Sequence, residues 1–217
     1  MAACRRDPAP PALTGEPVVL CAGDSITAGA YPERLQRRLA ESGLRYQVVN
    51  AGVKGNTSGE YLAFLRRSLI IERTNPRWVL LQIGTNDVRI DGDATPTARF
   101  RENLEAILDL VARHRNPDGL PPRVLLGTIP PITEEIRGRF DATSRARVAT
   151  DINPAIGETA ARRGIALVDN HRLFAARPEL LPGIHPSEDG YRALGDSWHD
   201  ALASQPGQAI LRPPPGP

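Results

Sequence analysis

The chain of 217 residues carries a formal net charge of +2 at pH 7, with 41% hydrophobic and 24% charged residues. This composition is typical of a globular protein, and the length suits a single domain with one core. The weak basic excess is spread along the chain and predicts no nucleic-acid partner. No segment approaches the ~18 apolar residues of a membrane span, so we expect no membrane insertion. The four histidines show no metal-ligand spacing, so we expect no metal site and no other cofactor.

Both ends of the chain are rich in proline, which predicts disordered tails. These tails are residues 1–14 and 204–217, so we place the domain at residues 15–203. The N-terminal stretch has no apolar segment of the kind found in a secretory signal, and the two cysteines do not form a disulfide framework. We therefore expect a cytoplasmic protein, and the oligomeric state stays open.

Five short apolar runs alternate with segments of helical pattern. The runs are near-continuous in Val, Leu and Ile, which is typical of strands buried on both faces of a parallel sheet. They occupy residues 17–23, 46–52, 77–84, 122–128 and 164–170. The intervening segments predict helices at residues 31–42, 58–71, 95–115, 141–163 and 187–203.

This alternation over one domain predicts a three-layer α/β fold with a parallel sheet and right-handed crossovers. The order of the strands does not follow from the pattern. In open α/β sheets, ligands bind outside the carboxyl ends of the strands, near the point where the strand order reverses. The loops that follow the strands are therefore where functional residues are expected.

Four loops carry polar residues that each have an ordinary structural explanation. They read "GDSITAG" (23–29), "NAGVKGNTSG" (50–59), "GTND" (84–87) and "GIHPS" (183–187). A Gly-Asp-Ser turn commonly leaves a strand and caps a helix, and Gly-Thr-Asn-Asp can form an Asx-turn. A lone histidine before a proline is usually a surface or capping residue.

Taken together, the four loops fit the chemistry of acyl transfer. The hydroxyl of Ser25 follows the first strand, and His185 supplies a base able to take its proton. The N–H groups of Ser25 and Gly55 and the side-chain amide of Asn86 give three donors for a developing oxyanion. At Gly55 the lack of a Cβ permits close approach of the backbone. Nucleotide-binding motifs are missing: the sequence has no G-x-x-x-x-G-K-[ST] and no G-x-G-x-x-G after the first strand.

With these motifs the chain resembles the SGNH (GDSL-type) hydrolase family of esterases, lipases, thioesterases and acyltransferases. "GDSIT", "NAGVKGNTS", "GTND" and "GIHPS" match four family blocks in order, and "TIPPI" (128–132) resembles the remaining one. The similarity spans about residues 17 to 200. It implies a five-stranded parallel sheet, flavodoxin-like, in the order 2-1-3-4-5. It also implies Ser25 as nucleophile, His185 as base, and Gly55 and Asn86 as oxyanion-hole donors.

The chain departs from the family at Pro182. The family has an aspartate three residues before the histidine, which holds the imidazole, and proline offers neither a carboxylate nor an N–H. Another carboxylate, that of Glu179 or Asp169, can replace it. Alternatively, a backbone carbonyl of Leu181 or Pro182 accepts from the imidazole and leaves a Ser–His dyad, which is the hypothesis we favour. The dyad predicts an ordinary pKa near ~6.5 for His185. A third alternative is a pseudo-hydrolase that binds its ligand without turnover.

The expected reaction is the hydrolysis of a small-molecule ester or thioester through an acyl-enzyme. Acyl transfer to an alcohol or amine uses the same residues, so the sequence does not separate the two. Residues that flank the catalytic loops are candidates for the substrate pocket, and their small or apolar character predicts a modest acyl group. Arg89 can hold an anionic substrate group or be a solvated loop residue. The candidates are Thr27, Ala28, Val88, Arg89, Ile129 and Ile184.

Overall fold

A computed structural model of the chain describes residues 12–92 and 94–206. Most of the two predicted tails, 1–14 and 204–217, therefore lies outside the described residues. Before the first strand, the backbone N–H of Thr14 donates to Oε1 of Gln47 over 2.9 Å. Within the described ranges, no helix is long and apolar enough to cross a membrane.

The five strands form one parallel sheet in the order β2-β1-β3-β4-β5, which confirms the fold that the sequence resemblance implies. The order reverses beside β1, so the carboxyl ends of β1 and β3 flank the switch point where α/β proteins bind ligands. The strands are β1 (Val18–Gly23), β2 (Gln47–Gly52), β3 (Trp78–Gln82), β4 (Arg123–Gly127) and β5 (Ala166–Val168).

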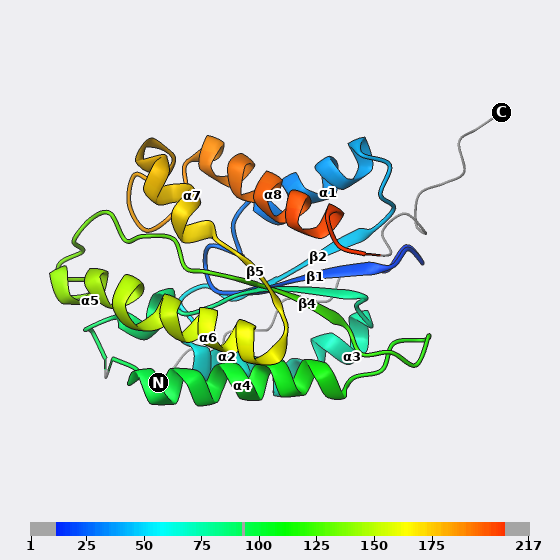
Figure 1. Cartoon of the computed structure of the whole chain (residues 1–217), viewed down its shortest axis with the longest axis horizontal. Coiled ribbons are helices and arrows are strands. Elements are labelled where there is room, and N and C mark those ends of the chain that lie inside the picture. Colours follow the sequence, from blue (N-terminus) through cyan, green and yellow to red (C-terminus); the bar gives the residue numbers. More distant parts are fainter. Residues whose placement is uncertain (1–11, 93, 207–217) are drawn as a thin grey trace.

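Helices cover both faces of the sheet, which gives the predicted three layers (Figure 1). One face carries α1 (Tyr31–Glu41), α7 (Asn170–Ala176) and α8 (Glu188–Ala203). The other face carries α2 (Ser58–Ser68), α3 (Ile70–Thr74), α4 (Thr97–Arg113), α5 (Ala142–Arg147) and α6 (Asn153–Arg163). Short helical turns complete the chain: η1 (Thr85–Val88), the π-helical η2 (Val148–Ile152) and η3 (Pro178–Leu180).

The two halves of the core follow from the alternation of side chains along the buried strands. In β1, Val19 and Cys21 pack toward α1 and α8, whereas Leu20 packs toward α2 and α4. Between α1 and α8 the rings of Tyr31 and Trp198 stack with centroids 6.3 Å apart. The central strand β1 is buried along its whole length and carries no polar side chain, and a polar loop begins where it ends.

Two predicted helices are interrupted. The helix expected at 58–71 ends early because Leu69 adopts a left-handed conformation with φ of 53°, and α3 starts anew after it. The helix expected at 141–163 is continuous in space but widens into the π turn η2. Pro154 comes shortly after this turn. Because proline has no N–H, it cannot donate the usual helical hydrogen bond to the carbonyl four residues earlier, which lies in the π turn.

The last predicted strand, 164–170, is shorter than expected, and the helix α7 that follows it was missed. Asp169 stops the strand and caps α7, since its carboxylate accepts from the backbone N–H of Arg172 over 3.0 Å. An aspartate after a short strand is a known start signal for a helix. The helix is so short that its sequence shows no clear helical period.

Candidate active site

Ser25 and His185 meet at the carboxyl end of β1, although 160 residues separate them. Oγ of Ser25 lies 2.8 Å from Nε2 of His185. The serine is presented by a tight turn that Asp24 holds: its buried Oδ1 accepts from the N–H of Ile26 over 3.0 Å. Ser187 fixes the chain after the histidine, because its side chain caps α8 and both its N–H and its hydroxyl donate to the carbonyl of Leu180. A hydroxyl in hydrogen-bond contact with an imidazole is the arrangement of an activated nucleophile and its base.

The carboxylate of Asp24 is completely buried beneath this serine. Its Oδ2 has no hydrogen-bond partner among the described residues. Burial raises the pKa of Asp24 to about 6. The turn that carries Ser25 therefore contains a carboxylate in an environment that disfavours its charge.

Asp87 joins the second and third polar loops to each other. Its Oδ2 accepts from the N–H of Ser58 over 2.9 Å, and its Oδ1 from the Ser58 hydroxyl over 2.6 Å. Beside it, Nδ2 of Asn86 donates to the carbonyl of Asn56 over 2.9 Å. These contacts hold the start of α2 against η1 and set Gly55 next to Asn86 in one pocket wall.

The backbone conformation of Gly55 favours glycine. A Cβ at this position would meet no other protein atom within 4 Å. Its φ of 80° lies in the left-handed region that side-chain-bearing residues avoid. This conformation turns the loop so that Gly55 lines the pocket beside Ser25.

Three donors are available near the serine. Among the described residues, the N–H groups of Ser25 and Gly55 have no acceptor. The amide of Asn86 uses one N–H on the Asn56 carbonyl, and its second N–H remains. Donors without an acceptor in the lining of a pocket are available to a bound ligand.

The pocket that holds Ser25 and His185 has a volume of about 740 Å³, within the usual range for small-molecule sites. Of the pocket residues expected from the sequence, the structure brings Ala28, Arg89 and Ile184 to it. The remaining candidates are buried in the core away from the pocket, where their side chains fill space between sheet and helices: Thr27, Val88 and Ile129.

Sequence reasoning missed several pocket residues: Gly29, Lys54, Asn56, Glu60, Arg139, Phe140 and Tyr191. Tyr191 could have been suspected from the sequence, because it lies at the start of the helix that follows His185, six residues further on. Gly29 leaves room for it: a Cβ there would lie 2.4 Å from the tyrosine hydroxyl. Arg139 and Phe140 come from the irregular segment between β4 and α5, which the sequence could not place.

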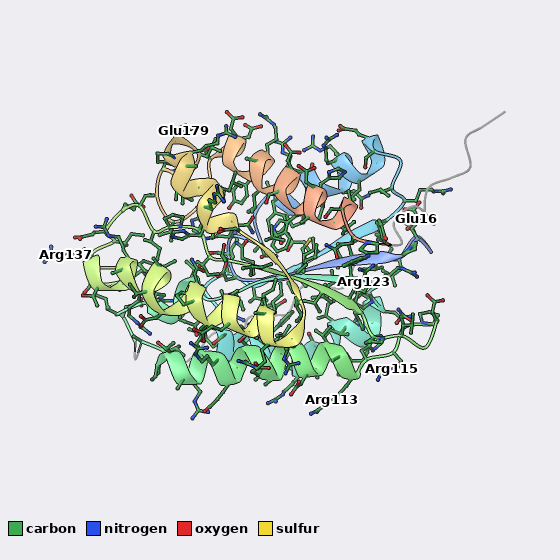
Figure 2. The ribbon with its side chains drawn as sticks, in the orientation of Figure 1. Glu16, Arg113, Arg115, Arg123, Arg137 and Glu179 are labelled. Atoms are coloured by element: carbon green, nitrogen blue, oxygen red, sulfur yellow. The ribbon has the colours of Figure 1, made fainter. Side chains whose placement is uncertain are left out.

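The two carboxylates considered as substitutes for the missing aspartate lie in other contacts. Glu179 pairs with Arg177 over 3.4 Å, and Figure 2 shows it at the outer surface near α7. Asp169 accepts from Oγ1 of Thr128 over 3.1 Å and caps α7. Within the described part of the chain, His185 makes no hydrogen bond other than that to Ser25.

Thr133 holds the backbone on both sides of Pro182. Its hydroxyl lies 3.0 Å from the carbonyl of Leu181 and 2.9 Å from that of Gly183, so it is shared between the two. The favoured carbonyl of Leu181 is thus engaged by Thr133 and not by the imidazole. The neighbouring side chain of Glu134 covers Gly183. The loop that carries His185 is therefore positioned from the segment that follows β4.

The pKa of His185 is lowered, first by burial and second by the positive charge of Lys54. This corrects the expectation of an unshifted value. No carboxylate raises this pKa, so the imidazole is neutral at pH 7 and able to accept a proton.

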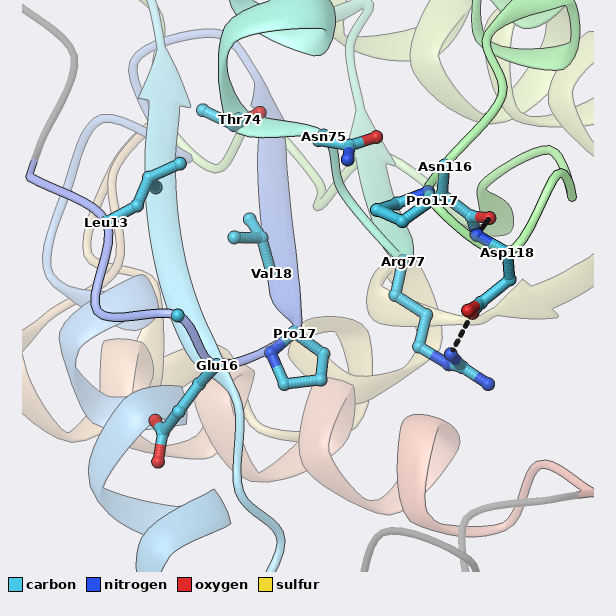
Figure 3. Close-up of a pocket in the computed structure, with 11 residues that line it drawn as sticks. Leu13, Glu16, Pro17, Val18, Thr74, Asn75, Arg77, Asn116, Pro117 and Asp118 are labelled. Atoms are coloured by element: carbon cyan, nitrogen blue, oxygen red, sulfur yellow. Dashed lines mark hydrogen bonds and ion pairs between the residues drawn. The ribbon is translucent and has the colours of Figure 1, made fainter.

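A second, smaller cavity lies at the opposite ends of the strands, where β1 and β3 begin (Figure 3). Its volume is about 340 Å³, and the ion pair between Arg77 and Asp118 lies at its wall. Neither Ser25 nor His185 reaches it. Across the described residues, no group of three or more His, Cys, Asp or Glu side chains is placed to hold a metal ion.

The chain is similar to known esterases. It is 30% identical over 185 residues to Esterase TesA of Pseudomonas aeruginosa, covering 78% of this chain and 86% of that protein. It is 27% identical over 135 residues to a multidomain esterase of Ruminococcus flavefaciens, covering 61% of this chain but only 16% of that protein. The crystal structure of a lipase/acylhydrolase from Enterococcus faecalis superposes with a TM-score of 0.73 at 26% identity, covering 92% of this chain and 100% of the other.

The sheet order and these relatives define the class as ester hydrolases. The chain belongs to the GDSL-like lipase/acylhydrolase family, whose pattern matches residues 21–193. The family resemblance seen in the sequence is thereby confirmed.

Proposed function

We propose that this protein hydrolyses a small carboxylic ester or thioester through an acyl-enzyme on Ser25. The observation that carries the proposal is the 2.8 Å contact between Oγ of Ser25 and Nε2 of His185, inside a pocket that also presents Gly55 and Asn86. Small side chains near the serine, such as Ala28 and Gly29, leave room for a modest acyl group.

In the proposed reaction His185 transfers one proton in each of two half-reactions. It takes the proton of Ser25 as Oγ attacks the carbonyl carbon, and the carbonyl oxygen becomes an oxyanion held by the N–H groups of Ser25 and Gly55 and by Asn86. Collapse breaks the bond to the alcohol or thiol, which leaves with the proton from His185. Water then attacks the acyl-enzyme as His185 takes its proton, and His185 gives that proton to Oγ of Ser25 as the acyl bond breaks and the carboxylic acid leaves.

The proposed catalytic pair is a Ser–His dyad. In a triad the acid fixes the tautomer and orientation of the imidazole and stabilises its cation. Here Thr133 and Ser187 fix the loop on either side of His185, which supplies part of the orientation. The neutral imidazole is favoured by burial and by Lys54, so the dyad starts in the form that a base requires.

Replacement of Thr133 by valine tests this positioning role. Valine keeps the shape but cannot bridge the carbonyls of Leu181 and Gly183, so His185 gains freedom relative to Ser25. We expect kcat to fall by about tenfold while KM changes little, because a misplaced catalytic group slows the chemical step and leaves substrate binding nearly unchanged. Thr133→Ser retains the hydroxyl and serves as the control. A parallel loss in both variants would show that the hydroxyl does not position the histidine.

The pH profile of kcat/KM tests the base. Since His185 must be neutral, activity rises with pH, and the lowered pKa places this limb below the ordinary imidazole value of ~6.5. Removing the cation in Lys54→Gln should move the limb to higher pH, whereas Lys54→Arg keeps the charge and should leave it in place. If the rise of kcat/KM occurs at the same pH in Lys54→Gln as in wild type, the charge of Lys54 does not lower the pKa of His185.

The proposed function itself is tested by mass spectrometry of the intact protein during turnover of 4-nitrophenyl acetate. An added acetyl group on Ser25, followed by release of acetate, supports hydrolysis. If added alcohols or amines speed deacylation and become acetylated, the protein is an acyltransferase. If no acyl-enzyme forms and no ester is cleaved, it is a ligand-binding pseudo-hydrolase. The expected cytoplasmic location stays a prediction.

A further inference from the structure

Three basic residues line the proposed catalytic pocket. Lys54, Arg89 and Arg139 line it together with Ser25. The acid that lines the same pocket is Glu60, whose carboxylate is engaged with its own helix start, since it accepts from the N–H and the hydroxyl of Thr57. The pocket lining thus contains more basic than acidic side chains.

Asp91 clamps the two arginines into fixed positions. It accepts from Nε and Nη2 of Arg89 over 2.6 and 2.5 Å, and from Nε of Arg139 over 3.2 Å. The backbones of the two segments are also joined, because the N–H of Ile90 donates to the carbonyl of Arg139 over 2.9 Å. One carboxylate therefore serves two guanidinium groups, and one positive charge is left over.

The clamp leaves several guanidinium donors unused. Among the described residues, Nη1 and Nη2 of Arg139 and Nη1 of Arg89 have no acceptor. The Arg89 side chain is only 24% exposed, so its charge lies partly inside the wall. Held guanidinium groups with open N–H groups match the planar, paired oxygens of carboxylates and phosphates.

We infer that the pocket takes an ester that bears an anionic group, a carboxylate or a phosphate, bound by Arg89 and Arg139 while Ser25 attacks the ester carbonyl. The inference rests on the proposed function and adds the substrate class. The apolar Phe140 and Ile184 line the same pocket and suit a short hydrocarbon part between the two groups. The clamp orients the guanidinium groups before the substrate arrives, which lowers the entropic cost of binding.

Matched pairs of charged and neutral esters test this inference. One set carries the charge on the leaving group: 4-acetoxybenzoate and 4-acetoxyphenyl phosphate against methyl 4-acetoxybenzoate. The other carries it on the acyl group: monophenyl succinate against its methyl ester. The measured quantity is the ratio of kcat/KM for the charged to the neutral ester, compared between wild type and Arg139→Gln. The intrinsic reactivity of each ester is the same for both proteins, so it cancels when the ratio in wild type is compared with the ratio in Arg139→Gln.

We expect the ratio to fall about tenfold in Arg139→Gln for at least one set, and to fall in wild type as salt rises. The leaving-group set also shows whether carboxylate or phosphate is preferred. Arg137→Gln, in the same segment but outside the pocket lining, is the matched control and should keep the wild-type ratio. Equal ratios in wild type and Arg139→Gln for every set would overturn the inference.

Binding measured without turnover separates this inference from the proposed function. Titration calorimetry of Ser25→Ala with the same esters measures their affinity for the pocket without any contribution from hydrolysis. Tighter binding of the charged ester, lost on adding Arg139→Gln, supports the anion site even if no ester is hydrolysed. Equal affinity for charged and neutral esters overturns it even if the neutral ester is hydrolysed.

Discussion

Replacement of Ser25 by alanine is expected to abolish both ester hydrolysis and labelling by a fluorophosphonate probe. Loss of the nucleophile in serine hydrolases costs on the order of 10⁴-fold or more in rate, since only the oxyanion donors and binding remain. The fold should persist, because the half-buried hydroxyl makes one hydrogen bond, to His185. Labelling followed by gel fluorescence, together with thermal unfolding, measures both effects.

The chain offers a matched control in a second Ser–His pair. Oγ of Ser42 lies 2.9 Å from Nε2 of His199, and Nδ1 of His199 lies 2.9 Å from Oδ1 of Asp200. This group has the connectivity of a triad, but neither Ser42 nor His199 lines the catalytic pocket. Ser42→Ala should therefore label like wild type. Loss of labelling in Ser42→Ala but not in Ser25→Ala would show that the reactive serine is Ser42, beside His199, and not Ser25.

Replacement of Asn86 by alanine is expected to lower kcat by about 10²–10³-fold with little change in KM. Removal of one oxyanion-hole donor has an effect of this size, because the donor acts on the charge that develops in the transition state. Steady-state kinetics with an aryl ester, analysed separately for kcat and KM, measures it. A rise in KM alone would show that Asn86 binds the ground state instead.

The same substitution also removes the contact from Asn86 to the carbonyl of Asn56, so loop disorder must be distinguished from loss of a donor. Asn103→Ala is the control. Its amide donates to Oγ of Ser58 over 3.0 Å and supports the same pair of loops from outside the pocket. If both variants lose equal activity, the effect of Asn86 is structural.

The layers of the fold could be predicted from the sequence because β1 and β3 are buried along their whole length, whereas the edge strands β2 and β5 are partly exposed. The strand order followed only from the family resemblance. A run such as "VVLCAG" has to be a buried strand in a parallel sheet, and the polar residues at its end have to lie at the carboxyl edge. The contact of Ser25 with His185 does not follow from strand pairing, because β3 and β4 lie between β1 and β5 in the sheet and His185 comes after β5 and α7. It was expected from the family resemblance. Local sequence did not show the left-handed Leu69 or the short α7, because both depend on a single residue's conformation or cap.

The walls of the pocket could not be predicted in the same way. Arg139 reaches the site from an irregular segment whose course depends on contacts far along the chain, such as that between Ile90 and Arg139. Conversely, Val88 and Ile129 flank catalytic motifs but point into the core. Adjacency in sequence to a functional loop therefore does not identify the side chains that face the ligand.

The buried carboxylate of Asp24 sets activity and stability against each other along the pH axis. Its pKa is raised from 3.8 to about 6, so its contribution to folding is fully present below pH 3.8 and is lost as pH rises through 6. Ionisation of this group costs the native state about 3 kcal/mol. His185 also gains its neutral, basic form as pH rises, and its pKa lies below the ordinary value because of burial and Lys54. Rising pH therefore favours the proposed base and, through Asp24, destabilises the native state around the turn that carries Ser25.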